Sequence, residues 1–216
     1  MNRQTDRQIN HKVLRVVVGC IALLLAPTVY FLSGSDKPLT SISISYWTDS
    51  RDIFVGSLVA VGFFLSAYNG GGNGRDCEYF LSKAACVFAI CVAFFPTEGF
   101  SQEDIPVRWV RAITEILNTR PQYVHYFSAI LFFACLIAMM WFFSKRAMAK
   151  GKAGRAYFYR TVSVLMATGI IVLGIYGRMT HSSNTTLLIE IWGLSLFGIG
   201  WLVAGSYKTD PLLDKQ

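Results

Sequence analysis

The side chains of this chain that could do chemistry are a few ionisable groups beside or within long apolar stretches. Two carboxylates, two histidines and one arginine have this placement: Asp52, His125, Arg178, His181 and Glu190. An ionisable group is costly at membrane depth, so it usually has a partner or a task there. Arginine and histidine can bind a phosphate, and two imidazoles with a carboxylate are ligands that zinc accepts. These five residues are therefore the predicted ligand-binding cluster.

Three interpretations of the cluster are open. In the first, His125 and Arg178 contact a lipid phosphate, while Asp52 and Glu190 hold these cations in place. In the second, the two histidines bind zinc with Asp52 or Glu190 and activate water for lipid hydrolysis. No HExxH or HxxxH pair places two ligands on one helical face, so we predict no resident metal and keep zinc as the alternative. In the third, ion pairs tie helix ends together and His125 hydrogen-bonds a loop carbonyl.

The elements that must position these residues are transmembrane helices. Of 216 residues, 53% are apolar and 15% are charged, and the mean hydropathy is +0.43. Six stretches nearly free of charge are long enough to cross the hydrocarbon core: 16–32, 53–68, 79–95, 122–143, 157–176 and 187–207. None alternates with a period of two, and backbone amides in lipid need internal partners. The sequence therefore predicts an all-α, polytopic six-helix membrane bundle, with residues 1–216 as a single transmembrane domain.

The distribution of lysine and arginine predicts the orientation. Fourteen of these 20 residues lie in the two tails and around the connections after the second and fourth stretches. Because short loops rich in positive charge stay on the cytoplasmic side, we predict cytoplasmic termini. The compactness of the chain suggests a bacterial inner membrane. All five candidate residues then lie near the outer face. The first stretch has a basic start like a signal peptide, but its apolar run is longer than a typical signal core, which favours an uncleaved anchor.

The outer segment 103–119 has apolar residues at helical spacing with charged residues between them. It predicts an amphipathic interfacial helix that Trp109 anchors. Such a helix either seals the end of the bundle or forms a lid over a lipid-accessible cavity.

Several other functions are disfavoured. The net charge of +7 comes from residues that membrane insertion already requires, so we predict no nucleic-acid partner. The five cysteines form no CxxC pair and are interpreted as packing residues. Ser41, Ser43 and Ser45 lack the GxSxG turn of a serine hydrolase. A small-solute transporter is a further alternative. The sequence argues against it, because it has neither the pair of broken helices nor the charged residue at mid-membrane that are typical of transporters.

Glycines recur in and directly after the fifth stretch, at 169, 174 and 177, and again in the sixth, at 193, 198 and 200. Small residues let helices approach closely, within one chain or between two. The second case leaves open a homo-oligomer or a partner membrane protein.

Four segments in order resemble the FRAG/DRAM/SFK-like six-span membrane proteins and their bacterial relatives. They are SISISYWTDSRDIFVG (41–56), FFPTEGF (94–100), VHYFSAILFF (124–133) and EIWGLSLFGIGW (190–201). In that group a histidine before a small residue opens the fourth span, and an acid near a tryptophan opens the sixth, as His125 and Glu190 would. The resemblance implies a compact six-helix protein tied to lipids, and it points to Asp52, His125 and Glu190. Eukaryotic members are linked to GPI-anchor lipid remodelling, phosphoinositide-kinase anchoring and lysosomal autophagy.

We therefore predict an integral membrane protein that binds, senses or helps remodel a membrane lipid at the outer-face cluster. Its predicted partners are membrane lipids. A metal-dependent, membrane-embedded lipid hydrolase is the first alternative and a transporter the second, so the sequence leaves open whether the protein is an enzyme.

Overall fold

The computed structural model describes residues 11–34, 38–68, 76–98 and 107–206. These residues form seven α-helices and one 3₁₀-helix, and none of them is in a strand. The elements are α1 (His11–Leu32), η1 (Ser43–Trp47), α2 (Arg51–Ser66), α3 (Cys77–Phe94), α4 (Arg108–Ile116), α5 (Pro121–Ala149), α6 (Ala153–Thr180) and α7 (Thr185–Ser206). The predicted all-α fold is confirmed.

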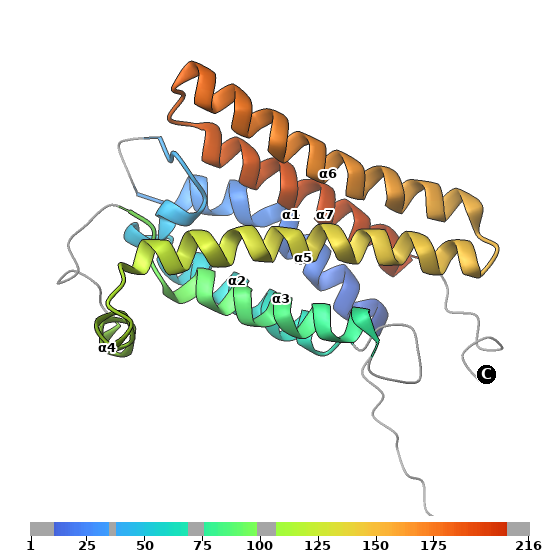
Figure 1. The fold of residues 1–216 in the computed structure, drawn as a ribbon, viewed down its shortest axis with the longest axis horizontal. Helices are drawn as coiled ribbons and strands as arrows, with labels where there is room; N and C mark the ends of the chain where they lie inside the picture. Colours follow the sequence, from blue (N-terminus) through green and yellow to red (C-terminus); the bar gives the residue numbers. More distant parts are fainter. Residues whose placement is uncertain (1–10, 35–37, 69–75, 99–106, 207–216) are drawn as a thin grey trace, which may run out of the picture.

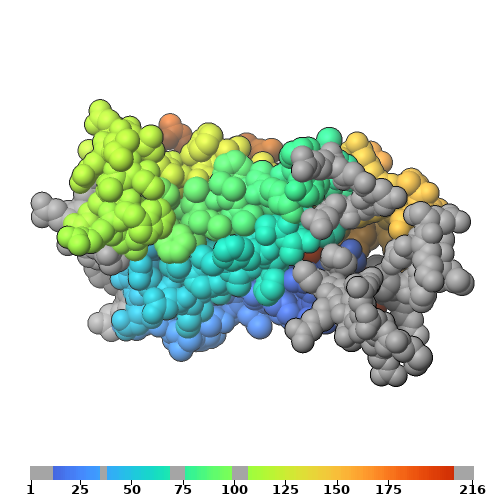
Figure 2. All heavy atoms as spheres, turned by 90° about the horizontal axis from the view of Figure 1, so that it is seen from below, coloured from blue at the N-terminus to red at the C-terminus, as the bar shows by residue number. Residues whose placement is uncertain are grey.

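The long helices run side by side, while α4 lies across one end of the bundle (Figure 1). At that end, called the α4 end here, are also η1 and the turn between α6 and α7. At the opposite end, called the termini end, α1 begins, α7 finishes, and α5 turns into α6. Figure 2 shows α2 and α3 side by side along one face, with α4 at its end.

Five helices are long and apolar enough to cross a membrane: Lys12–Leu32, Cys77–Phe94, Pro121–Ala149, Ala153–Thr180 and Thr185–Ser206. The chain is therefore a polytopic membrane protein. The second of the six predicted spans, 53–68, corresponds to α2, which has 16 residues and is shorter than the others. Five of the six predicted spans thus appear among the long apolar helices of the described residues.

Two helices extend well beyond the apolar runs that predicted them. The run 122–143 lies within the 29 residues of α5, and the run 157–176 lies within the 28 residues of α6. The additional turns carry polar and basic side chains such as Lys145 and Arg146. An apolar run marks the part of a helix that meets lipid, and the hydrogen-bonded backbone continues past it into the interface.

The helices approach closely at glycines, and α1 and α7 come together at Gly19 and Gly198. A Cβ atom on Gly198 would lie 2.9 Å from the backbone oxygen of Gly19, and one on Gly19 would lie 2.9 Å from the backbone oxygen of Gly198. The two backbones therefore touch without intervening side chains, as the small-residue rule for membrane helices predicts.

Several other glycines of α6 and α7 receive side chains from neighbouring helices of the same chain. Trp192 of α7 fills the space over Gly169, and Thr185 fills the space over Gly177. On α7 itself, Phe133 of α5 lies over Gly193. The predicted close approaches at these positions thus occur within one chain. Gly174 faces open space, because a Cβ atom added there would meet no other atom within 4 Å.

A continuous buried core runs along the bundle axis. At the termini end it contains an aromatic group in which the rings of Tyr68, Phe143 and Trp201 are 5.5–5.7 Å apart in edge-to-face pairs. All five cysteines are free thiols, and Cys86 and Cys135 are buried in the bundle, in agreement with their interpretation as packing residues.

Candidate functional site

Glu190 fastens the connection between α1 and α2 to α7. Its Oε2 accepts a hydrogen bond from the backbone N–H of Ile42 at 2.5 Å, and its Oε1 accepts one from the Ser43 hydroxyl at 2.6 Å. Ile42 is the N-cap of η1, so the carboxylate occupies the position where a helix start has N–H groups without partners. The backbone N–H of Leu187 donates to the carbonyl of Thr40 at 3.1 Å and adds a second attachment.

His125 is buried, with 2% of its surface exposed, and it holds the end of α3. Its Nδ1 lies 2.7 Å from the carbonyl oxygen of Phe95. A carbonyl oxygen can only accept, so Nδ1 carries the proton and donates it. Phe95 is the C-cap of α3, where the helix leaves carbonyls without an intrahelical partner. The hydrogen bond to a loop carbonyl that the third interpretation predicted for His125 is therefore present in the structure.

The other three predicted site residues point outward. The side chain of Asp52 is 95% exposed, and its nearest cation is Arg51, at 3.7 Å. Arg178 and His181 are exposed at the end of α6, and His181 ends that helix with a φ of 51°. The five residues lie on elements that meet at the α4 end. Among the described residues, no hydrogen bond or ion pair joins any two of the five side chains.

The zinc alternative requires the two histidines and a carboxylate to lie close to one another. Among the described residues, no group of three or more His, Cys, Asp and Glu side chains is placed to hold a metal ion. His125 and Glu190 are each hydrogen-bonded to a different loop. The physical reason is that the ends of α3 and η1 need capping groups, and these two polar side chains supply them.

Helix α4 forms within the predicted segment 103–119, whose first four residues lie outside the described ones. Val110 and Thr114 are buried on its inner face, and the Trp109 ring packs edge-on against Phe94 at 5.3 Å. Ile116 is 83% exposed. The helix therefore seals the bundle end with one face and leaves apolar side chains exposed on another, which is typical of an interfacial helix.

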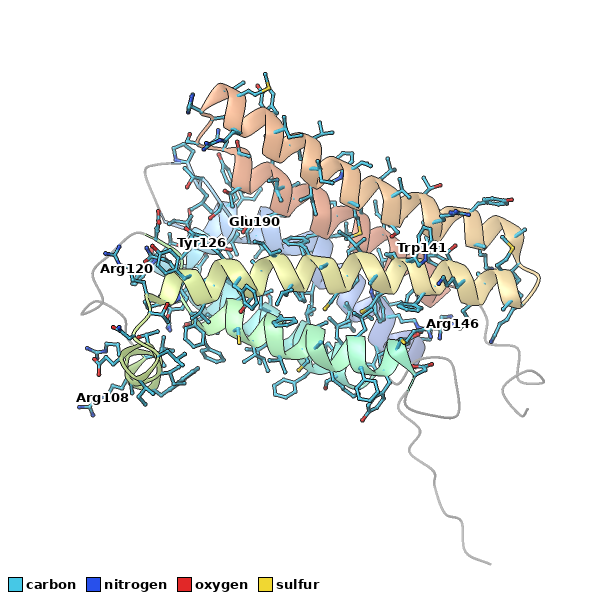
Figure 3. The ribbon with its side chains drawn as sticks, viewed as in Figure 1. Arg108, Arg120, Tyr126, Trp141, Arg146 and Glu190 are labelled. Atoms are coloured by element: carbon cyan, nitrogen blue, oxygen red, sulfur yellow. The ribbon has the colours of Figure 1, made fainter. Side chains whose placement is uncertain are left out.

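A second polar cluster lies at the termini end, and the sequence alone did not predict it. A guanidinium nitrogen of Arg146, on α5, is 3.1 Å from Oε2 of Glu78, on α3. The hydroxyl of Tyr68, in the loop after α2, donates to the same oxygen at 2.9 Å and also contacts Arg146. Figure 3 labels Arg146 at this end and Glu190 toward the other. The available signal was Glu78 itself, an acid in a region of positive charge.

Burial raises the pKa of the Tyr68 phenol above its ordinary value, Glu78 adds to this rise, and Arg146 opposes it. The phenol therefore stays protonated at neutral pH and keeps its role as a donor. The Arg146 guanidinium also lies over the rings of Tyr68 and Phe143, at 5.7 and 5.0 Å from their centroids. The cluster joins α5, α3 and the α2–α3 connection through one ion pair and its aromatic surroundings.

No protein-family model, curated protein or solved structure matches this chain.

Replacing His125 by alanine is expected to destabilise the protein by about 1–3 kcal/mol, because the Phe95 carbonyl loses its buried donor. Thermal unfolding in detergent would measure the loss. The matched control is His181→Asn, which removes an exposed imidazole and keeps a residue type that tolerates positive φ. Equal stability of the two variants would contradict the capping role.

Proposed function

We propose that this protein binds phospholipid headgroups at the α4 end. In this proposal it has six spans in a bacterial inner membrane, with cytoplasmic termini, and is a distant relative of the FRAG/DRAM/SFK-like proteins. The observation that carries the proposal is that the four segments of the sequence resemblance hydrogen-bond to one another at this end. Glu190 holds segment 41–56 at Ile42, and His125 holds segment 94–100 at Phe95.

Two further hydrogen bonds complete this connection between segments. The indole N–H of Trp47 donates to the carbonyl of Thr97 at 3.2 Å. The hydroxyl of Thr97 then donates to the Tyr126 hydroxyl at 3.0 Å. These hydrogen bonds between residues distant in sequence hold the loops at the α4 end in fixed positions. A binding site formed by loops requires such support.

The side chains that would meet the lipid are the exposed ones. Trp109 and Ile116 on α4, and Leu117 directly after it, are exposed and would meet the acyl boundary. Arg178 and His181 are exposed at the same end of the bundle and would contact phosphate oxygens. In this proposal His125 and Glu190 act indirectly, by holding the loops, while Asp52 lies exposed at the start of α2.

The proposal of six spans adds α2 to the five long apolar helices. The 16 residues of α2 extend about 24 Å at 1.5 Å per residue, somewhat less than the hydrocarbon core of about 30 Å. It packs beside α3 and α1 within the same bundle. A small mismatch of this kind is accommodated by local thinning of the bilayer or by polar side chains that reach the interface. The basic residues at the termini end support cytoplasmic termini.

We expect the double substitution Arg178→Gln with His181→Gln to weaken phospholipid binding about 3–10-fold, because a charge-assisted contact to phosphate is lost. Native mass spectrometry of the purified protein with added phosphatidylglycerol or phosphatidylethanolamine would measure the binding. The control, Lys150→Gln, removes an exposed charge at the termini end. Binding that is unchanged in the double variant would argue against a headgroup site at the α4 end.

The depth of α4 is tested separately, in lipid vesicles. The difference in fluorescence between wild type and Trp109→Phe isolates the emission of Trp109. We expect lipids brominated near the headgroup to quench this emission and aqueous acrylamide to quench it weakly. The reverse pattern would contradict an interfacial α4.

A further inference from the structure

Two buried N–H groups beside Tyr68 have no acceptor in the described part of the chain. They are Nε of Arg15, on α1, and Nε1 of Trp201, on α7. The guanidinium carbon of Arg15 lies 5.9 Å from the Tyr68 ring centroid, and the Trp201 ring lies 5.7 Å from it. Buried donors are almost always satisfied in native proteins, by protein atoms, water or a bound ion. Two such donors around one side chain therefore indicate a missing acceptor.

The register of α7 places the two donors on the same side of that helix. Nη1 of Arg15 donates to the backbone carbonyl of Ala204 at 3.3 Å. Ala204 follows Trp201 by three residues, so both lie on one helical face. Gly205 lets α7 lie close to this part of α1, since a Cβ at that position would be 2.9 Å from Cγ2 of Val16 and 3.4 Å from the Cβ of Arg15. The Arg15 side chain thus lies along the face of α7 that carries Trp201.

Among the described residues, the charges around Tyr68 do not balance. The Arg146 guanidinium is neutralised by Glu78 at 3.1 Å. Arg15 contributes a second positive charge, and no carboxylate of the described residues forms an ion pair with it. A half-buried cation without a counter-ion is unfavourable, and an anion that also accepts hydrogen bonds corrects both deficits.

We propose that the termini end binds one phosphate group, with Arg15 and Trp201 donating to its oxygens. Arginine offers several N–H groups in a planar fork that matches phosphate, and an indole N–H beside an apolar ring suits the boundary between lipid and water. The phosphate comes either from an acidic phospholipid or from free inorganic phosphate. This site is at the opposite end of the bundle from the headgroup site proposed above, so either proposal can fail without the other.

The experiment measures the melting temperature of the purified full-length protein in neutral detergent. The additions are phosphatidylglycerol, phosphatidylcholine, or sodium phosphate against sodium chloride at equal ionic strength. We expect phosphatidylglycerol, sodium phosphate or both to raise the melting temperature of the wild type by about 3–6 °C relative to the neutral lipid or chloride. A response to phosphatidylglycerol alone identifies a lipid headgroup, and an equal response to inorganic phosphate identifies free phosphate.

The variants assign the response to the two donors. Arg15→Gln and Trp201→Phe are each expected to lose at least half of the shift, whereas Lys150→Gln, which removes an exposed charge from the same bundle end, keeps it. Trp201→Phe tests the site independently if Arg15→Gln fails to fold. The proposal is overturned if the wild type shows no anion-specific shift. It is equally overturned if every variant that folds responds like the wild type.

Discussion

Replacing Glu78 by alanine is expected to destabilise the protein by about 3–5 kcal/mol, the usual loss when one partner of a buried ion pair is removed. The Glu78 side chain is 11% exposed and that of Arg146 is 22% exposed, so solvent screens the pair only weakly. The substitution leaves the guanidinium without a counter-ion and takes the acceptor from the Tyr68 hydroxyl. Unfolding monitored in mixed detergent micelles would measure the change in free energy.

A double-mutant cycle measures the interaction energy between Glu78 and Arg146 separately from the contribution of each side chain alone. We expect Glu78→Met with Arg146→Met to be less destabilising than the sum of the two single substitutions, because neither charge is then left unpaired. The control is Glu115→Ala, which removes an exposed acid from α4 and should change stability by less than about 0.5 kcal/mol. Additive single effects would show that Glu78 and Arg146 do not stabilise each other.

Replacing Gly198 by valine is expected to separate α1 from α7 and to abolish most of the folded protein. The new Cβ would lie 2.8 Å from the Leu23 side chain and 2.9 Å from the backbone oxygen of Gly19. A flexible side chain can move away, but the backbone of a packed helix cannot move without losing its neighbours. Overpacking usually costs about 1–3 kcal/mol, and more where backbone is the obstacle. The fraction that elutes as a monodisperse peak in size-exclusion chromatography would report the loss.

Gly174→Val is the matched control, since a Cβ there meets no atom within 4 Å. This variant makes the same glycine-to-valine change in a membrane helix but creates no clash with another helix. Its elution profile should therefore match that of the wild type. If the two valine variants behave alike, the contact between Gly19 and Gly198 does not hold α1 against α7.

The fold was predictable to the extent that it depends on local composition. Each long apolar run corresponds to a helix, because hydrocarbon thickness requires about 20 apolar residues and lipid requires internal hydrogen bonds. Helix α4 was predictable from its amphipathic spacing for the same local reason. Composition could not show how far α5 continues past its apolar run, because a helix backbone remains hydrogen-bonded after its side chains become polar.

The partners of the polar side chains were less predictable. Topology correctly placed His125 and Glu190 at one end of the bundle, yet it suggested a common site, whereas each of them caps a different element. The ion pair between Arg146 and Glu78 was not predicted. The positive charge of Arg146 was already explained by the rule that basic residues lie on the cytoplasmic side of the membrane.

The sequence alone determined that this is a helical, multi-pass membrane protein and which end of the bundle each polar residue occupies. Only the tertiary structure decided which of them meet, since Glu190 and Ile42 are 148 residues apart and Arg146 and Tyr68 are 78 residues apart. The physical reason is that apolar periodicity is a property of one helix. A polar contact between segments depends on which helices are neighbours and how each is rotated, and close backbone contacts such as Gly19 with Gly198 set both.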